Sequence, residues 1–206
     1  MKQWMRVLFA AMLMLLSGSS AFAYTETISP QEGQTIADVE TLALGAPLYT
    51  EKEGTPTREE FVRIMNEAGP KLLKCKFVSY EEVAQGIAQT TGKDIYAMDR
   101  IPAAKVFRDH VKEYADAYVV STVTKSRRTV FFFDVYRAGT KDLIYAYEMV
   151  LDPDEPDDLK TYDEMVGKFY KNFNWSAADQ KKAQKKEREE QEKAERKAQR
   201  AREKAS

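Results

Sequence analysis

Cysteine and histidine are almost missing from this 206-residue chain, which contains one of each, Cys75 and His110. A single thiol cannot close a disulfide within the chain, so no internal bridge supports the fold. A single imidazole excludes histidine-rich metal sites and any Ser-His-Asp arrangement that does not use His110. We interpret Cys75 as a small, partly buried residue near the start of a strand, and His110 as a structural or surface residue beside the apolar face of a helix. The alternatives are a reactive thiol or a bridge between chains for Cys75, and a catalytic base for His110.

Long apolar runs are also scarce. The longest extends from Val7 to Leu16, which is shorter than the roughly 20 residues that a membrane-spanning helix needs. It follows Lys2 and Arg6 and is followed by small residues up to Ala23, the arrangement of a cleavable secretory signal peptide. We therefore predict an exported protein, periplasmic or extracellular, without a transmembrane helix once residues 1–23 are removed. No cysteine stands at the cleavage point, so a lipid anchor is not expected.

Large apolar side chains are entirely lacking in the last part of the chain. From Ser176 to Ser206 there is no Leu, Ile, Val, Phe, Met, Tyr or Trp, and 11 Lys and Arg stand against 7 Asp and Glu, a net charge of +4. From Tyr24 to Trp175 the count is 19 against 26, a net charge of −7. A segment with nothing to bury is predicted to be a solvated charged helix or a disordered tail rather than a coiled coil. The expected parts are a signal peptide (1–23), a loose polar leader (24–35), a globular domain (36–175) and a charged tail (176–206).

Four stretches have the apolar spacing of amphipathic helices. Two begin with a capping box, in which a hydroxyl and a glutamate three residues later bond each other's backbone amides: Thr57 with Glu60, and Ser79 with Glu82. Gly69-Pro70 is expected to end the first of these helices. The other two helices are expected to run from Ile101-Pro102 to about Tyr114 and from about Leu159 to Asn172, the last with a wide aromatic stripe.

Segments rich in valine, threonine and aromatic residues follow the third of these helices and are typical of strands. Three of them are joined by short polar links, which predicts an antiparallel meander: Ala117–Thr124, Thr129–Tyr136 and Leu143–Val150. Shorter strands or apolar segments are expected at 36–44 and 76–78. Because helices alternate with short strands before the meander, the predicted fold class is α/β, or α+β in two layers, with a mixed sheet and packed helices.

Two phrases carry a resemblance to a known superfamily. They are Tyr114–Val123 (YADAYVVSTV) and Phe133–Tyr145 (FDVYRAGTKDLIY). The first resembles the entry into the central strand, and the second the hairpin of the meander, in the TolB amino-terminal domain and the related curli-secretion-lipoprotein and penicillin-binding-protein-activator domains. The resemblance covers about residues 36–150 and implies an envelope protein that acts by binding other proteins. No functional residue can be carried over, and the lipid-bearing cysteine and the long membrane hairpins of some members are absent, which disfavours a secretion pore.

Carboxylates and cations mark three further places in the domain. Asp152 to Asp158 is a dense acidic loop, but two prolines stiffen it, so we interpret it as a solvated loop that caps the last helix, with a calcium site as the alternative. Asp134 and Glu148 interrupt apolar strands and indicate a wetter side of the sheet. Lys125 to Arg128 is a basic turn, interpreted as a solvated hairpin tip that could also meet an anionic partner.

The charged tail is the candidate binding surface. It has no aromatic residue to stack on bases, so nucleic acid is not an expected partner. A mostly cationic arm could lie on anionic lipid headgroups or acidic wall polymers, although interleaved glutamates weaken it; the alternative is a solubilising extension without a partner. The candidate contacts are Lys181, Lys182, Lys185, Lys186, Arg188, Arg196, Lys197, Arg200 and Arg202.

Two hypotheses about function follow from these observations. The first is an exported, non-catalytic module of the cell envelope whose α/β body binds another protein and whose basic tail spans a gap or contacts an anionic surface. The second is an exported enzyme or small-molecule-binding protein with a site built from Asp134, Glu148, tyrosines and the basic turn. No nucleophile, metal or phosphate constellation is recognisable, so no catalytic residue, cofactor or metal ligand is assigned and the first hypothesis is favoured. A deep polar pocket with strongly shifted carboxylates would favour the second.

Overall fold

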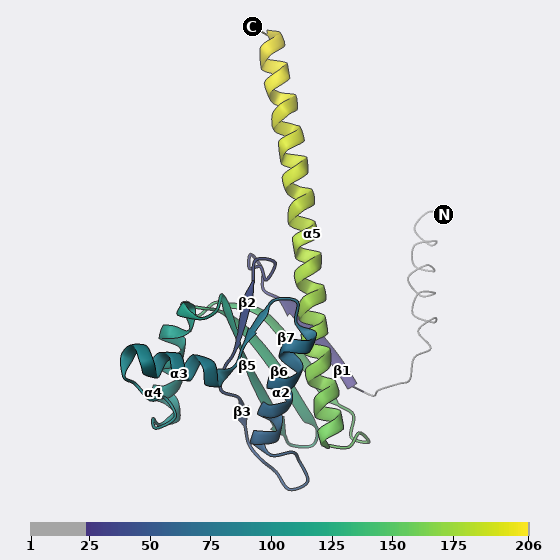
Figure 1. Cartoon of the computed structure of the whole chain (residues 1–206). Coiled ribbons are helices and arrows are strands. Elements are labelled where there is room, and N and C mark those ends of the chain that lie inside the picture. Colours follow the sequence, from purple (N-terminus) through teal and green to yellow (C-terminus); the bar gives the residue numbers. More distant parts are fainter. Residues whose placement is uncertain (1–23, 206) are drawn as a thin grey trace, which may run out of the picture.

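A seven-stranded mixed sheet forms the centre of the fold (Figure 1). The computed structural model describes residues 24–205, so the predicted signal peptide, residues 1–23, lies outside the described residues. The strand order is β1-β7-β6-β5-β2-β4, and β3 pairs with β5 farther along that strand than β2 does. The strands are β1 (Tyr24–Pro30), β2 (Thr41–Leu44), β3 (Leu48–Tyr49), β4 (Lys76–Val78), β5 (Ala117–Lys125), β6 (Thr129–Arg137) and β7 (Leu143–Leu151).

The central strands form the antiparallel meander that the sequence predicts. β5 pairs with β6, and β6 with β7, in antiparallel register, whereas β2 is parallel to both β4 and β5. The predicted mixed α/β fold is therefore confirmed. A bulge in β7 next to Tyr136 buries both Ile144 and Tyr145, although simple alternation would place Ile144 on the opposite face.

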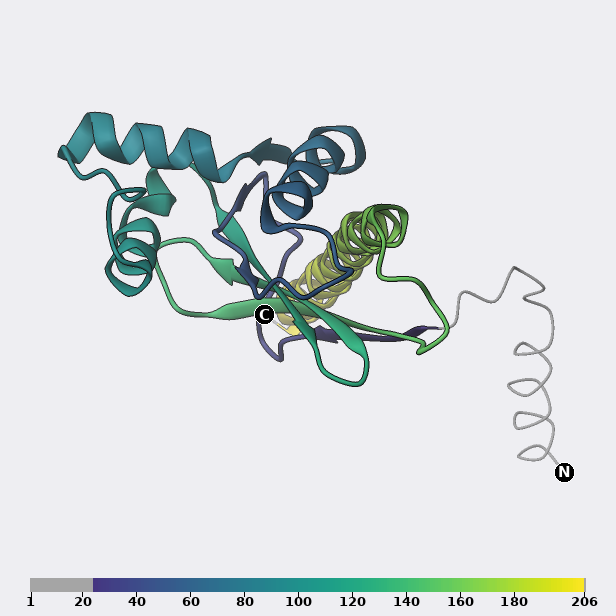
Figure 2. The same cartoon turned by 90° about the horizontal axis from the view of Figure 1, so that it is seen from below.

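Helices cover both faces of the sheet, but to different extents (Figure 2). Neighbouring strand residues point to opposite faces, so Leu42 packs with α2 and α5 in one buried cluster and Ala43 with α3 and α4 in another. The helices are α2 (Arg58–Leu72), α3 (Tyr80–Thr91), α4 (Arg100–His110), a 3-10 turn η1 (Val111–Glu113) and α5 (Leu159–Ala205).

The α3–α4 face of the sheet is covered at one end only. Its buried cluster takes in Tyr118 of β5 and reaches Tyr136 of β6. Farther along the meander, side chains on this face keep partial exposure and belong to neither buried cluster. We call this surface the open sheet face, and its residues are Thr122, Val130, Phe132, Asp134, Ala146, Glu148 and Val150.

The polar segment after the predicted cleavage site is not a loose leader, which corrects the prediction for residues 24–35. β1 forms one edge of the sheet, antiparallel to β7, with Tyr24 opposite Leu151 and Pro30 opposite Tyr145. An edge strand is hydrogen-bonded on one side only and is held further by side chains on one face. In β1, Ile28 packs against the core. The domain therefore begins at β1, whose backbone hydrogen bonds come from a strand more than a hundred residues away.

Both predicted capping boxes are present. Thr57 Oγ1 accepts from the Glu60 amide at 3.2 Å, and the Thr57 amide donates to Glu60 Oε2 at 2.8 Å; Ser79 and Glu82 bond in the same way. The prediction that Gly69-Pro70 ends the first helix is wrong, because α2 continues to Leu72. Pro70 lacks the amide that would donate to the carbonyl four residues earlier, and the helix ends two residues after it.

The last helix is much longer than predicted. Instead of ending near Asn172, α5 runs without interruption for 47 residues, about 70 Å at 1.5 Å per residue. Within residues 24–205 no helix is both long enough and apolar enough to cross a membrane.

The boundary between domain and tail lies farther along the chain than the predicted position after Trp175. Trp175, predicted to close the globular body, is 61% exposed, whereas Ser176 is only 7% exposed. Gln180 Oε1, one turn farther on, accepts from the Ile36 amide at 2.8 Å. We therefore call residues 24–180 the body and residues 181–205 the arm; from 181 to 200 every residue is exposed.

Candidate functional site

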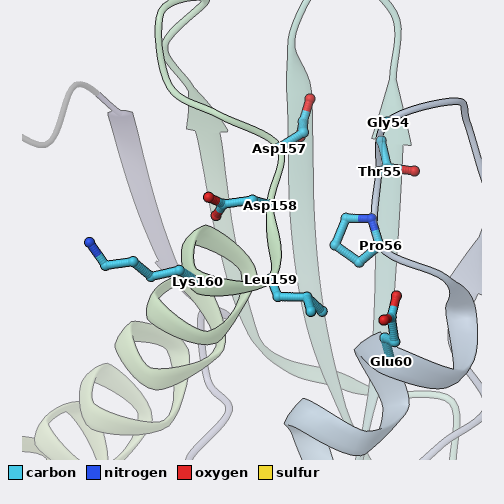
Figure 3. A pocket seen from close by; sticks show the side chains of 8 residues that line it. All are labelled: Gly54, Thr55, Pro56, Glu60, Asp157, Asp158, Leu159 and Lys160. Carbon is cyan, nitrogen blue, oxygen red and sulfur yellow. The ribbon is translucent and has the colours of Figure 1, made fainter.

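Two small cavities lie beside Asp157, at the end of the sheet where the acidic loop passes into α5. Their volumes are about 370 and 300 Å³. Figure 3 shows that the first lies between two segments, with residues 54–60 on one side and residues 157–160 on the other. The second is lined by Gly54, Lys125, Arg127, Arg128, Thr129, Leu151, Asp152, Pro153, Glu155 and Asp157.

The acidic loop and the basic turn meet each other in this region. Lys125 Nζ lies 2.8 Å from Asp157 Oδ2, and Thr129 Oγ1 donates to the same oxygen at 2.9 Å. Arg127 and Arg128 remain exposed, as a hairpin tip should. Lys125 and Asp157 thus neutralise each other, and the rest of the second cavity's lining has two arginines against two carboxylates, so this cavity has no strong charge of one sign with which to select a ligand.

The end of the acidic loop caps α5, as the sequence predicts. The Thr161 amide donates to Asp158 Oδ1 at 2.8 Å, and this backbone hydrogen bond is the main cause of the lowered pKa of the Asp158 carboxyl. Over residues 24–205, no three His, Cys, Asp or Glu side chains are grouped so that they could hold a metal ion. Asp158 thus serves the helix terminus, and Asp157 serves the ion pair with Lys125.

The residues of the second functional hypothesis do not form one site. Asp134 and Glu148 both belong to the open sheet face, where Asp134 lies opposite Ala146 and Glu148 opposite Phe132. The basic turn lies at the end of the hairpin and pairs with the acidic loop. Neither of the two cavities is lined by these two carboxylates. The structure therefore separates the basic turn from the two carboxylates, which share one face of the sheet.

The tyrosines are divided between the two faces of the sheet. Tyr118 and Tyr136 stack at 5.5 Å between ring centroids beside α4, on the same face as Asp134. Tyr145 and Tyr147 are buried on the opposite face, among the residues that pack against α5. They contribute to packing, and the sequence could not assign them to a face without the register of the meander.

Asp134 is a half-buried carboxylate of the open sheet face. Burial raises its pKa above the ordinary value of 3.8, and its charge in turn raises the pKa of Tyr136, after the larger effect of burial on that tyrosine. A raised pKa in the folded state means that ionisation of Asp134 opposes folding. The stability associated with the protonated form is complete below the unfolded-state pKa and is lost as the pH rises through the folded-state pKa.

We expect Asp134→Asn to be more stable than the parent at pH 7, with a difference that disappears as the pH falls below the ordinary aspartate pKa of about 3.9. Urea unfolding at a series of pH values measures this difference. Asp142→Asn, which removes a carboxyl from an exposed turn, is the control. A difference between Asp134→Asn and the parent that is constant with pH would contradict the prediction.

Cys75 and His110 lie on different faces of the sheet. Cys75 is partly buried against the α2–α5 cluster, directly before β4, as predicted. Burial is the main cause of its raised pKa, so the reactive thiolate is disfavoured. His110 ends α4 on the other face, with Nδ1 3.1 Å from Glu113 Oε1. The two residues form no thiol–imidazole pair.

The structure places the predicted tail cations on a single helix. At 100° per residue, five cations fall within an arc of about 60°; we call them the basic stripe, and they are Lys182, Lys186, Lys193, Lys197 and Arg200. Lys181, Lys185, Arg188 and Arg196 lie on an adjacent side of the arm, and the side chain of Arg202 is outside the described part of the chain.

The helical geometry also adds two residues that the sequence analysis missed. Lys193 belongs to the basic stripe, and Trp175 lies in line with it, seven residues before Lys182. The missed signal was the series of intervals of three, four and seven residues that begins at Trp175. It could be recognised only once α5 was known to continue through residue 175 without a break.

The fold and this surface define a class: a mixed α/β domain with a charged helical arm that continues from its core. No family model matches the chain, and no curated protein matches it. Among solved structures, the chain is similar to the PelC dodecamer from Paraburkholderia phytofirmans at 8% identity and a TM-score of 0.39, covering 73% of this chain and 97% of that one. A single-substitution variant of that PelC, in a second crystal form, gives 10% identity, the same TM-score of 0.39, and coverage of 73% and 99%.

Proposed function

We propose that this chain is an exported, non-catalytic binding module of the cell envelope, whose body docks a protein partner and whose arm holds the body at an anionic surface. One observation carries the proposal: α5 is a single helix that is part of the hydrophobic core and then continues into solvent. Phe169 and Phe173 are 0% and 2% exposed, while the arm beyond them extends for about 37 Å with only charged, polar and alanine side chains.

This continuity fixes the arm's direction relative to the body. A helix joined by a flexible linker would only add charge and solubility. Here the Gln180 side chain bonds the loop before β2, accepting from Ile36 N and Thr35 Oγ1 at 2.8 and 3.0 Å. Ion pairs within the arm, such as Glu192 with Arg196 at 3.9 Å, add a few tenths of a kcal/mol each to the helix. A rigid arm supports a role in positioning the body.

The open sheet face is the surface that we assign to the protein partner. Phe132, Val130 and Val150 give it an apolar centre, and Asp134 and Glu148 give it negative charge. A complementary partner would present apolar side chains flanked by Lys or Arg. The signal-peptide pattern of residues 1–23 and the resemblance to envelope binding domains support the same role.

The test is photo-crosslinking in intact cells with the full chain. A crosslinkable residue at position 132 is compared with one at position 96, because Tyr96 is 60% exposed but lies outside the open sheet face. We expect a defined protein adduct from position 132 alone, and its loss when Asp134 and Glu148 are both changed to Lys. If neither position gives a specific adduct while the purified protein binds a metabolite, the second hypothesis, a small-molecule-binding protein or enzyme, replaces this one.

A further inference from the structure

We propose that α5 carries a peripheral lipid-binding surface, in which the basic stripe and Trp175 lie flat on an anionic bilayer. The inference rests on the proposed function, because it identifies the surface that the arm contacts. Three features of α5 carry it: the alignment of these side chains, their direction relative to the body, and the chemistry of an exposed tryptophan in line with lysines.

The alignment follows from helical geometry. Trp175, Lys182, Lys186, Lys193, Lys197 and Arg200 are separated by seven, four, seven, four and three residues. Each interval brings the helix back to nearly the same side. The side chains therefore form one line, about 37 Å long from end to end at 1.5 Å per residue. Lys171, one turn before Trp175 and also exposed, extends the line toward the body.

The stripe points away from the body. Phe169, Phe173 and Gln180 mark the side of α5 that packs against the sheet and the loop before β2. By the same helical geometry, Trp175 and the basic stripe lie about 140° around the helix from that side. A flat surface can therefore reach the whole line without a collision with the body, and α5 then lies between this surface and the sheet.

Trp175 favours a bilayer over a soluble polyanion. It is 61% exposed, the second most exposed of the large hydrophobic residues in the described part of the chain. Indole rings prefer the headgroup region, where an apolar layer meets water, and lysine stems can lie along the same layer with their ammonium groups at the phosphates. An acidic wall polymer offers charge but no apolar layer, so it would leave the tryptophan in water.

The acidic residues of α5 along this line keep the predicted binding weak. Asp179 lies on the line itself, and Glu190 at its edge lies 3.9 Å from Lys186. Each lysine close to an anionic bilayer strengthens adsorption by roughly fivefold, and added salt screens this attraction. We therefore expect reversible adsorption that weakens with salt and requires anionic lipid.

This orientation of α5 also decides which face of the body is turned away from the bilayer. α5 packs on one face of the sheet, and the open sheet face is the other. With the basic stripe on the bilayer, the open sheet face points away from the membrane. The lipid surface and the proposed protein-binding surface would then operate at the same time.

The fluorescence of Trp175 can report contact with the bilayer. Trp4 and Trp175 are the only tryptophans, so in the chain from Tyr24 to Ser206 all tryptophan emission comes from Trp175. The probe is a vesicle of phosphatidylglycerol and phosphatidylcholine, with pure phosphatidylcholine as the neutral vesicle. We expect adsorption and a blue shift of the emission with anionic vesicles only, together with quenching by brominated lipid.

Matched variants test the stripe. Lys182→Gln, Lys186→Gln and Lys193→Gln combined remove three stripe charges; Lys181→Gln, Lys185→Gln and Arg188→Gln combined remove three charges from the adjacent side. Glutamine has a helix propensity close to that of lysine and arginine, so both variants keep the helix. The stripe variant should bind anionic vesicles on the order of 100-fold more weakly, and the control only a few-fold more weakly.

Two results would overturn the proposal: equal weakening by both variants, or adsorption without a change in Trp175 emission. Binding to soluble polyglutamate as strong as to vesicles, with unchanged emission, would assign the arm to a polymer instead. These assays contain no protein partner, so a failed crosslink at position 132 with intact vesicle binding would refute the docking role alone. Loss of vesicle binding with an intact crosslink would refute the lipid surface alone.

Discussion

Replacement of Phe169 by alanine is expected to lower the free energy of unfolding by about 3–5 kcal/mol. Phe169 is 0% exposed and stacks on Phe133 with 4.4 Å between ring centroids. It also packs against Tyr147 and Tyr170, so its removal leaves a cavity between α5 and the sheet. The loss combines the burial of an aromatic ring with the cost of that cavity.

Chemical denaturation followed by circular dichroism measures this loss. The matched control is Trp175→Ala on the same helix, where the side chain is 61% exposed and the expected change is within about 0.5 kcal/mol. Similar losses in the two variants would mean that α5 does not pack against the sheet as described. The core assignment and the rigid link between body and arm would then both be wrong.

Shortening the chain should show a sharp boundary within α5. A chain that ends at Gln184 keeps every contact of the body and is expected to unfold within about 0.5 kcal/mol of the parent. A chain that ends at Trp175 loses Gln180 and leaves the amide of Ile36, a residue that is 0% exposed, without its acceptor. An unsatisfied buried donor costs about 1–3 kcal/mol. Fraying of the new terminus next to Phe173 adds to that cost.

The Tm values of the two shortened chains show where the folded body ends. For a domain of about 150 residues, each kcal/mol moves Tm by about 2–4 °C, so the chain ending at Trp175 should melt several degrees below the one ending at Gln184. Gln180→Ala in the full chain removes the hydrogen bonds to Thr35 and Ile36 without creating a new helix terminus. The loss of Tm in this variant therefore measures those hydrogen bonds apart from fraying. Equal Tm values for both shortened chains would restore the boundary at Trp175 that the sequence predicts.

Elements whose signals are local were predicted well. The capping boxes at Thr57 and Ser79 depend on a glutamate three residues away, and the strands of the meander depend on composition and short links. All of these are confirmed, with strand ends that agree to within one residue. The charge division between body and arm was also readable from the sequence, since it needs only a count.

Elements that depend on distant partners were missed. β1 has a polar sequence without a period and becomes a strand because β7 supplies its hydrogen bonds. Trp175 was predicted to close the globular body, yet α5 continues through this residue and leaves its side chain 61% exposed. The candidate site shows the same limit: the tail cations were predicted, but their alignment with Trp175 was not.

The sequence by itself therefore determined the helix starts, the meander, the opposite charges of body and arm, and the absence of any large apolar side chain after Trp175. These follow from neighbours within a few residues, where backbone hydrogen bonding and side-chain spacing act. Only the tertiary structure decided that β1 belongs to the sheet, that the body extends to Gln180, and that the stripe faces away from it. Each of these depends on contacts between segments more than a hundred residues apart, such as Gln180 with Ile36, which no local pattern can encode.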